Sequence, residues 1–353
     1  MKRLILEKDA IKKNLSVIKE KAGGAVIYAV LTGDAYGAGL VEMAKLLRDE
    51  GIGRFAVSEP GEVEKLRKAG FVDEEILMLR STTDREELEK LMDLNAICTV
   101  GSYDAGVALN GIAEGRATVA EAHIQVDTGM GFGGFLSSEP DKILSMYRYL
   151  PNVALSGIYT QIHAAAGGEK GAQLQLTELN QVLDMIHEAG FETGTVHAAG
   201  SYALMHYDFA RLDGVRVGSA ILGRSSGGRG LTKVGYGEAA LEEIRWLPKG
   251  HTVGNDRLVT LNKPTRVAVL PVGYQNGFGL ELQRDGGLWA VLRRWWRSRK
   301  MAVRIGSQRV KVLGKVGAIE TLLDVTELKC VPGDIAVFDI DPLLARGMKK
   351  EFR

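Results

Sequence analysis

Short β-branched runs alternate with amphipathic helical stretches through the first part of this 353-residue chain. The runs cover residues 24–31, 54–58, 75–80, 96–100, 121–127, 153–160, 195–199 and 214–222. Between them, apolar residues recur at helical spacing, for example over 40–50 and 84–93. Eight strand–helix units in succession favour a closed parallel sheet, because each helix returns the chain to the same edge. We therefore predict an α/β fold, a (β/α)8 barrel of the TIM type.

The pattern changes near residue 230. Strand-like runs now follow one another without intervening helices, at 238–247, 265–272, 301–305, 309–317 and 334–339. This succession predicts an antiparallel β domain. We assign the barrel to residues 8–230 and the C-terminal β domain to residues 231–353, and we expect a strand within residues 1–7 to join the β domain.

The composition favours small partners over polymers or membranes. Lysine plus arginine number 45 against 44 for aspartate plus glutamate, a formal charge of +1, so no nucleic-acid or anionic-membrane partner is expected. Cys98 and Cys330 lie far apart in the sequence, which predicts reduced thiols and no metal site. Charged residues interrupt the N-terminus and no run approaches the ~20 apolar residues of a membrane span. We expect a cytoplasmic protein.

Several of the predicted strands end in distinctive motifs. These are Ala29-Val-Leu-Thr-Gly-Asp-Ala-Tyr-Gly37, Val126-Asp-Thr-Gly-Met-Gly131, His197-Ala-Ala-Gly-Ser201 and Val215-Arg-Val-Gly218, followed in the β domain by Val272-Gly-Tyr-Gln-Asn-Gly-Phe278. Barrel active sites form at the carboxyl ends of the strands, and the loops after the last two strands commonly bind phosphate. Ser201, Gly218 and Ser219 are candidates for such a cup, with packing in tight turns as the alternative.

In their order and residue types, these motifs resemble those of the alanine racemase family of fold-type III pyridoxal-phosphate enzymes. Within that family, they most resemble the alanine/serine racemase domains of the vancomycin-resistance type. The resemblance implies a pyridoxal phosphate cofactor and a homodimer in which the partner's β domain completes each pocket. It assigns the cofactor phosphate to Tyr36, Ser201, Gly218 and Ser219, and the pyridine nitrogen to Arg216. A structural arginine bridging strand ends is the alternative for Arg216.

The residues that the family uses for chemistry are replaced here. Thr32 stands where the family has the lysine that holds the cofactor as a Schiff base, and a hydroxyl cannot form an imine. Asn255 aligns with the family's second base, a tyrosine, and an amide is no base near neutral pH. Racemisation needs two bases, on opposite faces of the substrate. Both proton carriers are therefore missing.

Further departures surround the same pocket. Phe132 replaces an arginine and cannot donate a hydrogen bond. The family's Thr-His, Asn-Ser and Met-Asp pairs stand here as Thr160-Gln161, Gly200-Ser201 and Ala318-Ile319, and its carbamylated lysine as Gln125. The resemblance thus places in the substrate pocket Thr32, Phe132, Gln161, Asn255, Tyr274, Ala318 and Ile319.

Concerted losses around one pocket indicate natural divergence. We predict a racemase-inactive homologue, a pseudoenzyme or a re-purposed enzyme, that binds pyridoxal phosphate noncovalently or another phosphorylated or amino-acid-like small molecule. The alternative is an active pyridoxal-phosphate-dependent alanine or serine racemase. His163 is a candidate for a new catalytic role, against the alternative of a solvated or helix-capping histidine.

The segment 288–300 interleaves tryptophans with basic residues. Such a pattern can bind an acidic partner, an anionic membrane or nucleic acid. We favour a hairpin insertion that packs its tryptophans on the β domain and leaves its basic face in water.

Overall fold

The computed structural model describes residues 1–131, 133–163, 168–224, 230–254, 259–280 and 303–353. The chain divides into two compact units. One comprises Asp9–Lys233, and the other joins Met1–Lys8 to Val234–Arg353. Phe132, Asn255 and the segment 288–300 lie outside the described residues.

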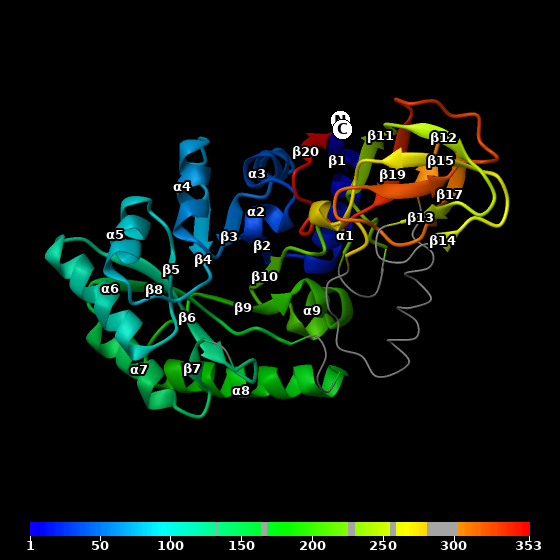
Figure 1. Ribbon diagram of the computed structural model, residues 1–353. Helices are drawn as coiled ribbons and strands as arrows, with labels where there is room; N and C mark the ends of the chain where they lie inside the picture. Colours follow the sequence, from blue (N-terminus) through cyan, green and yellow to red (C-terminus); the bar gives the residue numbers. More distant parts are fainter. Residues whose placement is uncertain (132, 164–167, 225–229, 255–258, 281–302) are drawn as a thin grey trace. The chain divides into compact units, whose positions relative to one another are not determined.

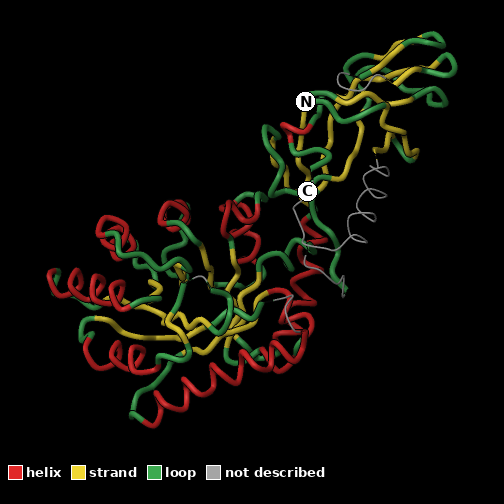
Figure 2. The backbone as a smooth tube through the Cα atoms, turned by 60° about the horizontal axis from the view of Figure 1, so that its bottom comes forward, coloured by secondary structure: helices red, strands yellow, loops and turns green. Residues whose placement is uncertain are grey.

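The larger unit is a parallel β barrel surrounded by helices (Figures 1 and 2). Its strands are β2 (Val26–Val30), β3 (Arg54–Val57), β4 (Glu75–Met78), β5 (Cys98–Val100), β6 (Ala120–Asp127), β8 (Val153–Tyr159), β9 (Thr195–Gly200) and β10 (Gly214–Val217). They follow the order β4-β3-β2-β10-β9-β8-β6-β5. A bridge between Leu77 and Ile97 joins the ends of this order, where Met78 N–H donates to the carbonyl oxygen of Ile97 at 2.8 Å. The predicted barrel is confirmed.

The helices of this unit cover the outside of the strands (Figure 2). They are α1 (Lys8–Ala22), α3 (Leu40–Asp49), α4 (Pro60–Lys68), α5 (Arg85–Asp93), α6 (Tyr103–Gly115), α7 (Pro140–Tyr149), α8 (Gly168–Glu188) and α9 (Ser201–His206). Sequence features set their ends and faces: Asp84 caps α5 by accepting from Glu87 N–H at 2.9 Å, and α3 buries Met43, Ala44 and Leu47. A short strand, β7 (Phe135–Leu136), pairs with β6.

The smaller unit is built on a sheet with the order β12-β15-β18-β17-β16-β19-β11-β1-β20. Its strands are β1 (Lys2–Leu6), β11 (Tyr236–Ala240), β12 (Ile244–Leu247), β15 (Thr265–Leu270), β16 (Val303–Ile305), β17 (Gln308–Leu313), β18 (Thr321–Asp324), β19 (Ile335–Asp339) and β20 (Lys349–Phe352), with β13 (Thr252–Val253) and β14 (Val259–Thr260) paired separately. The pairing is antiparallel except between β1 and β20, which run parallel. The predicted antiparallel β domain is therefore confirmed.

Several predicted strands have other bounds, and for two of them the hydrogen bonds show the cause. The run 238–247 forms two strands because the chain changes partners at Leu241: its carbonyl accepts from Gly333 N–H at 2.8 Å, and Glu242 N–H then donates to Val269 at 3.0 Å. The run 214–222 ends as a strand at Val217, because a turn follows, closed by Ile221 N–H on the carbonyl oxygen of Gly218 at 2.9 Å. No helix among the described residues is long and apolar enough to cross a membrane.

Candidate ligand site at the barrel mouth

The chain leaves β2 in a left-handed turn, labelled α2 (Thr32–Tyr36) in Figure 1. Its φ angles are 64° at Gly33, 59° at Asp34, 56° at Ala35 and 53° at Tyr36. This conformation costs a residue with a Cβ roughly 1–2 kcal/mol, so neighbouring contacts must stabilise the turn. Glu62 of α4 accepts from Asp34 N–H at 3.1 Å, and Asp34 Oδ1 accepts from Leu40 N–H at 2.8 Å.

The turn places Tyr36 against the end of β10. A Cβ on Gly218 would lie 2.6 Å from Tyr36 Oη, so only glycine allows the phenol this close. Burial raises the pKa of Tyr36, which keeps the phenol neutral and able to donate a hydrogen bond at neutral pH.

Ser201, the first residue of α9, lies beside the same turn. Its Oγ accepts hydrogen bonds from Gly218 N–H at 3.0 Å and from Ala220 N–H at 3.2 Å. A hydroxyl that accepts twice still has its own hydrogen to donate. The structure thus brings together Tyr36, Ser201 and Gly218, with half-buried Ser219 next in the chain, and a cluster of such donors suits phosphate oxygens.

Arg216, on β10, is 4% exposed and points its guanidinium at neutral acceptors. Nη1 donates to His197 Nδ1 at 2.6 Å and to the His197 carbonyl at 3.1 Å. Nη2 donates to the Thr160 carbonyl at 2.6 Å and to Gln161 Oε1 at 2.7 Å. The guanidinium also lies 4.6 Å from the ring centroid of Tyr159. Burial lowers the pKa of Arg216 to about 10, so the group remains charged at neutral pH.

Two histidines, His197 and His123, extend the hydrogen-bond network of Arg216. Because Arg216 donates to His197 Nδ1, the hydrogen of His197 is on Nε2, and it donates to His123 Nδ1 at 2.9 Å. Burial, and then the charge of Arg216, lowers the pKa of His123 to about 4 and that of His197 well below its usual value. Both imidazoles are therefore neutral at neutral pH.

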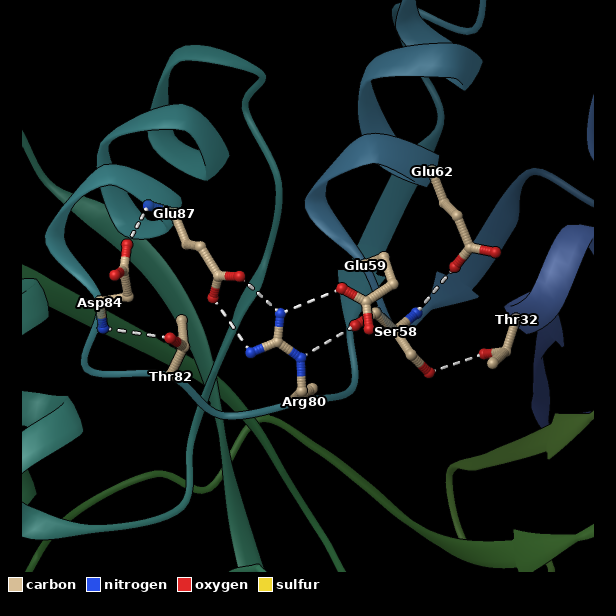
Figure 3. Close-up of polar contacts among 8 residues, drawn as sticks. All are labelled: Thr32, Ser58, Glu59, Glu62, Arg80, Thr82, Asp84 and Glu87. Carbon is tan, nitrogen blue, oxygen red and sulfur yellow. Dashed lines mark hydrogen bonds and ion pairs between the residues drawn. The ribbon is translucent and has the colours of Figure 1, made fainter.

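Thr32 begins the same left-handed turn, just after β2, and its side chain contacts Ser58, the residue that follows β3 (Figure 3). Its Oγ1 is 2.9 Å from Ser58 Oγ, a hydrogen-bond distance. Ser58 N–H donates to Glu62 Oε2 at 3.2 Å, so the carboxylate that stabilises the left-handed turn also holds the residue that contacts Thr32.

Arg80 extends this second network past the end of β4 (Figure 3). Its Nε donates to the Ser58 carbonyl at 3.3 Å. Its terminal nitrogens contact Glu87 at 2.8 and 3.0 Å and Glu59 at 3.2 Å. Ser58, Glu62 and Arg80 were missed by the sequence analysis, although each lies within five residues of a strand end, which is the signal that could have found them.

The remaining predicted residues are more dispersed. Gln161 lines a cavity of about 20 Å³ together with Gln125, Val126, Asp127, Met130, Gly133 and Thr160, room for one water-sized group. His163 N–H donates to Gln175 Oε1 at 3.2 Å, and its buried Nδ1 has no hydrogen-bond partner among the described residues. Tyr274, Ala318 and Ile319 belong to the smaller unit, where Tyr274 is 50% and Ile319 58% exposed.

The residues fit one end of pyridoxal phosphate and not the other. The cup of Tyr36, Ser201 and Gly218 suits the phosphate. A covalent bond to the aldehyde requires an amine, and the side chain at the end of β2 is the hydroxyl of Thr32.

Comparison with known proteins identifies the family. Residues 6–226 match the model of the alanine racemase N-terminal domain, and residues 236–341 match that of the C-terminal domain. This chain belongs to the alanine racemase family. It is 32% identical over 337 residues to an alanine racemase of Carboxydothermus hydrogenoformans, covering 93% of this chain and 86% of the relative. It is 27% identical to a lysine racemase of Proteus mirabilis, covering 93% and 77%.

Solved structures of the family share the fold. An alanine racemase of Clostridium difficile 630 superposes with a TM-score of 0.83 at 24% identity, covering 99% of this chain and 88% of that one. The alanine racemase of a D-cycloserine-producing Streptomyces lavendulae gives a TM-score of 0.86 at 19% identity, covering 100% and 97%.

Proposed function

We propose that this alanine racemase homologue binds a phosphorylated small molecule at the barrel mouth without forming a covalent bond to it and without racemising an amino acid. Pyridoxal phosphate is the first candidate ligand, because the family is pyridoxal-phosphate-dependent. The observation that carries the proposal is the hydroxyl pair of Thr32 and Ser58, 2.9 Å apart, at the position that the sequence resemblance assigns to the family's lysine.

The chain's own groups support binding more than proton transfer. The neutral phenol of Tyr36 and the hydroxyl of Ser201 donate to the phosphate, and Gly218 N–H holds the Ser201 oxygen in place, with Ser219 next in the chain. When pyridoxal phosphate is bound, its ring supplies an electron sink for amino-acid chemistry. The hydroxyls of Thr32 and Ser58 cannot accept a proton near neutral pH, so neither of them can serve as the base that racemisation requires.

The second candidate is an active alanine or serine racemase, and the sequence similarity to named racemases favours it. Relatives that match more than nine tenths of the chain are named alanine racemases. Under this candidate the chain would need an amine other than residue 32 to attach the cofactor.

We also propose a homodimer in which the β domain of one protomer contributes to the partner's pocket. Tyr274 and Ile319 are exposed on the smaller unit, which fits side chains available to a second copy. Light scattering coupled to gel filtration tests the stoichiometry.

Titration of the purified protein with pyridoxal phosphate, followed by borohydride reduction and mass spectrometry, separates the two candidates. We expect saturable binding that Ser201→Ala weakens, no covalent adduct, and no interconversion of D- and L-alanine or serine. Thr32→Lys is the positive control for covalent attachment. Absence of saturable binding refutes the proposal, and an adduct with turnover in the natural sequence establishes the racemase.

A further inference from the structure

Gln161 lies between Arg216 and the mouth cavity. Its Oε1 accepts from Arg216 Nη2 at 2.7 Å, and its side chain lines the cavity of about 20 Å³. Of these two side chains, Gln161 lines the cavity and Arg216 does not.

The terminal hydrogens of Arg216 are already used. Nη1 and Nη2 each have two hydrogens, and each makes two hydrogen bonds, to His197 Nδ1 and carbonyl oxygen and to the Thr160 carbonyl and Gln161 Oε1. A ligand atom can reach either terminal nitrogen only by displacing one of these acceptors.

The amide nitrogen of Gln161, in contrast, has hydrogen-bonding capacity to spare. Among the described residues Nε2 makes one long hydrogen bond, at 3.5 Å, to the Ile162 carbonyl. Gly200 leaves space beside it, because a Cβ there would lie 2.7 Å from Nε2. The charge-assisted bond from Arg216 to Oε1 polarises the amide and strengthens Nε2 as a donor.

We propose that Gln161 determines ligand specificity by donating a hydrogen bond to an uncharged acceptor, such as a ring nitrogen or a carbonyl oxygen, on the phosphorylated ligand. Arg216 positions the amide of Gln161 through its hydrogen bond to Oε1. Because Gly200 adjoins Ser201 of the phosphate cup, one small molecule can reach both. This inference rests on the proposed function, since it assumes that the cup holds the phosphate.

A matched pair of ligands tests the inference: benzyl phosphate and 3-pyridylmethyl phosphate, which differ only in the ring nitrogen. Calorimetric titration of the natural sequence is expected to favour the pyridyl compound about five-fold, the contribution of one neutral hydrogen bond. Gln161→Glu keeps the acceptor for Arg216 and removes the donor, so the preference should fall to about one or below. Gln161→Ala should lose the preference as well.

Gln181→Glu, on the exposed surface of α8, is the charge-matched control and should keep the preference. Equal binding of both ligands by the natural sequence overturns the inference alone. An increased preference in Gln161→Ala also overturns it, because Arg216 would then read the ligand directly. If neither ligand binds, the proposed function and the inference both fail.

Discussion

Arg216 and Arg80 stand at the carboxyl ends of barrel strands on two sides of the mouth, yet their surroundings differ. Arg216 is buried and hydrogen-bonds to neutral acceptors of His197, Thr160 and Gln161. The Arg80 side chain is 39% exposed and pairs with the carboxylates of Glu59 and Glu87.

The difference determines where an anion finds favourable charge. The carboxylates beside Arg80 offset its charge, whereas the hydrogen-bond partners of Arg216 among the described residues include no carboxylate. A positive charge in a water-poor environment acts over a longer range than one in solvent. This contrast supports the proposed phosphate site beside Arg216, whereas the polar groups around Thr32 and Arg80 are paired with one another.

Removing each arginine should expose this contrast most strongly. Arg216→Met leaves buried acceptors of His197 and Gln161 without a donor, and we expect the free energy of unfolding to fall by about 3–5 kcal/mol. Arg80→Met removes half-exposed ion pairs and should cost at most about 1 kcal/mol. Urea denaturation measures both, and equal losses would contradict the comparison.

Deleting one hydroxyl on each side tests the assignment of the ligand. Ser201→Ala removes a donor to phosphate, and benzyl phosphate should bind about 10- to 100-fold more weakly, the range for a hydrogen bond to a charged group. Ser58→Ala, on the Thr32 side, should change the dissociation constant by less than about two-fold. The assignment is wrong if the two variants weaken binding equally.

Acid should affect the two sides in different pH windows. The folded-state pKa of His123 is about 4, below its usual 6.5, so the unfolded chain binds the proton more tightly. The stability this histidine contributes is complete above pH 6.5 and is lost as the pH falls toward 4, with about 1 kcal/mol lost at pH 5.5. His123→Asn should flatten this loss in urea titrations at pH 7.5 and 5.5.

On the other side, the hydrogen bond from Arg80 lowers the pKa of Glu87 below 4.5, so its contribution is lost only in more acidic solution. We expect the stability to fall first through the buried histidines, already at pH 5.5, and only at lower pH through Glu87. A loss of stability that begins only below pH 4.5 would contradict this order.

The smallest effect concerns Gly200. Gly200→Ala introduces a Cβ 2.7 Å from Gln161 Nε2, so the amide must move, and the preference for the pyridyl phosphate should fall by a few-fold while benzyl phosphate binding stays nearly unchanged. Gly61→Ala, where a Cβ meets nothing within 4 Å, is the matched control. If Gly200→Ala keeps the preference for the pyridyl phosphate, Gln161 Nε2 is not the group that recognises the ring nitrogen.

The sequence predicts the elements that a repeated local pattern encodes. Eight β-branched runs are enough to predict the barrel, because every unit repeats the same period. The strands Thr321–Asp324 and Lys349–Phe352 were missed because they are short and, in the second case, charged. Lys349–Phe352 becomes a strand only by pairing with β1 at the far end of the chain, a contact that no local window contains.

The same limit applies to the site. Strand-end motifs predicted Tyr36, Ser201, Gly218 and Arg216, which the structure does place at the strand ends expected. The contact between Gln161 and Arg216 joins side chains 55 positions apart in the chain. The fit between Gln161 and Gly200 depends on a rotamer and a missing Cβ, so two departures that look independent in the sequence become one feature in space.

The left-handed turn after β2 depends on contacts with a later part of the chain. Its positive φ angles are unfavourable in isolation, and a carboxylate from α4, which follows the next strand, holds Asp34 in place. Tyr36 therefore reaches Gly218 only after β3 and α4 have packed beside β2. Because Ser201 and Gly218 follow β9 and β10, the proposed cup is complete only when the first and the last βα units have assembled.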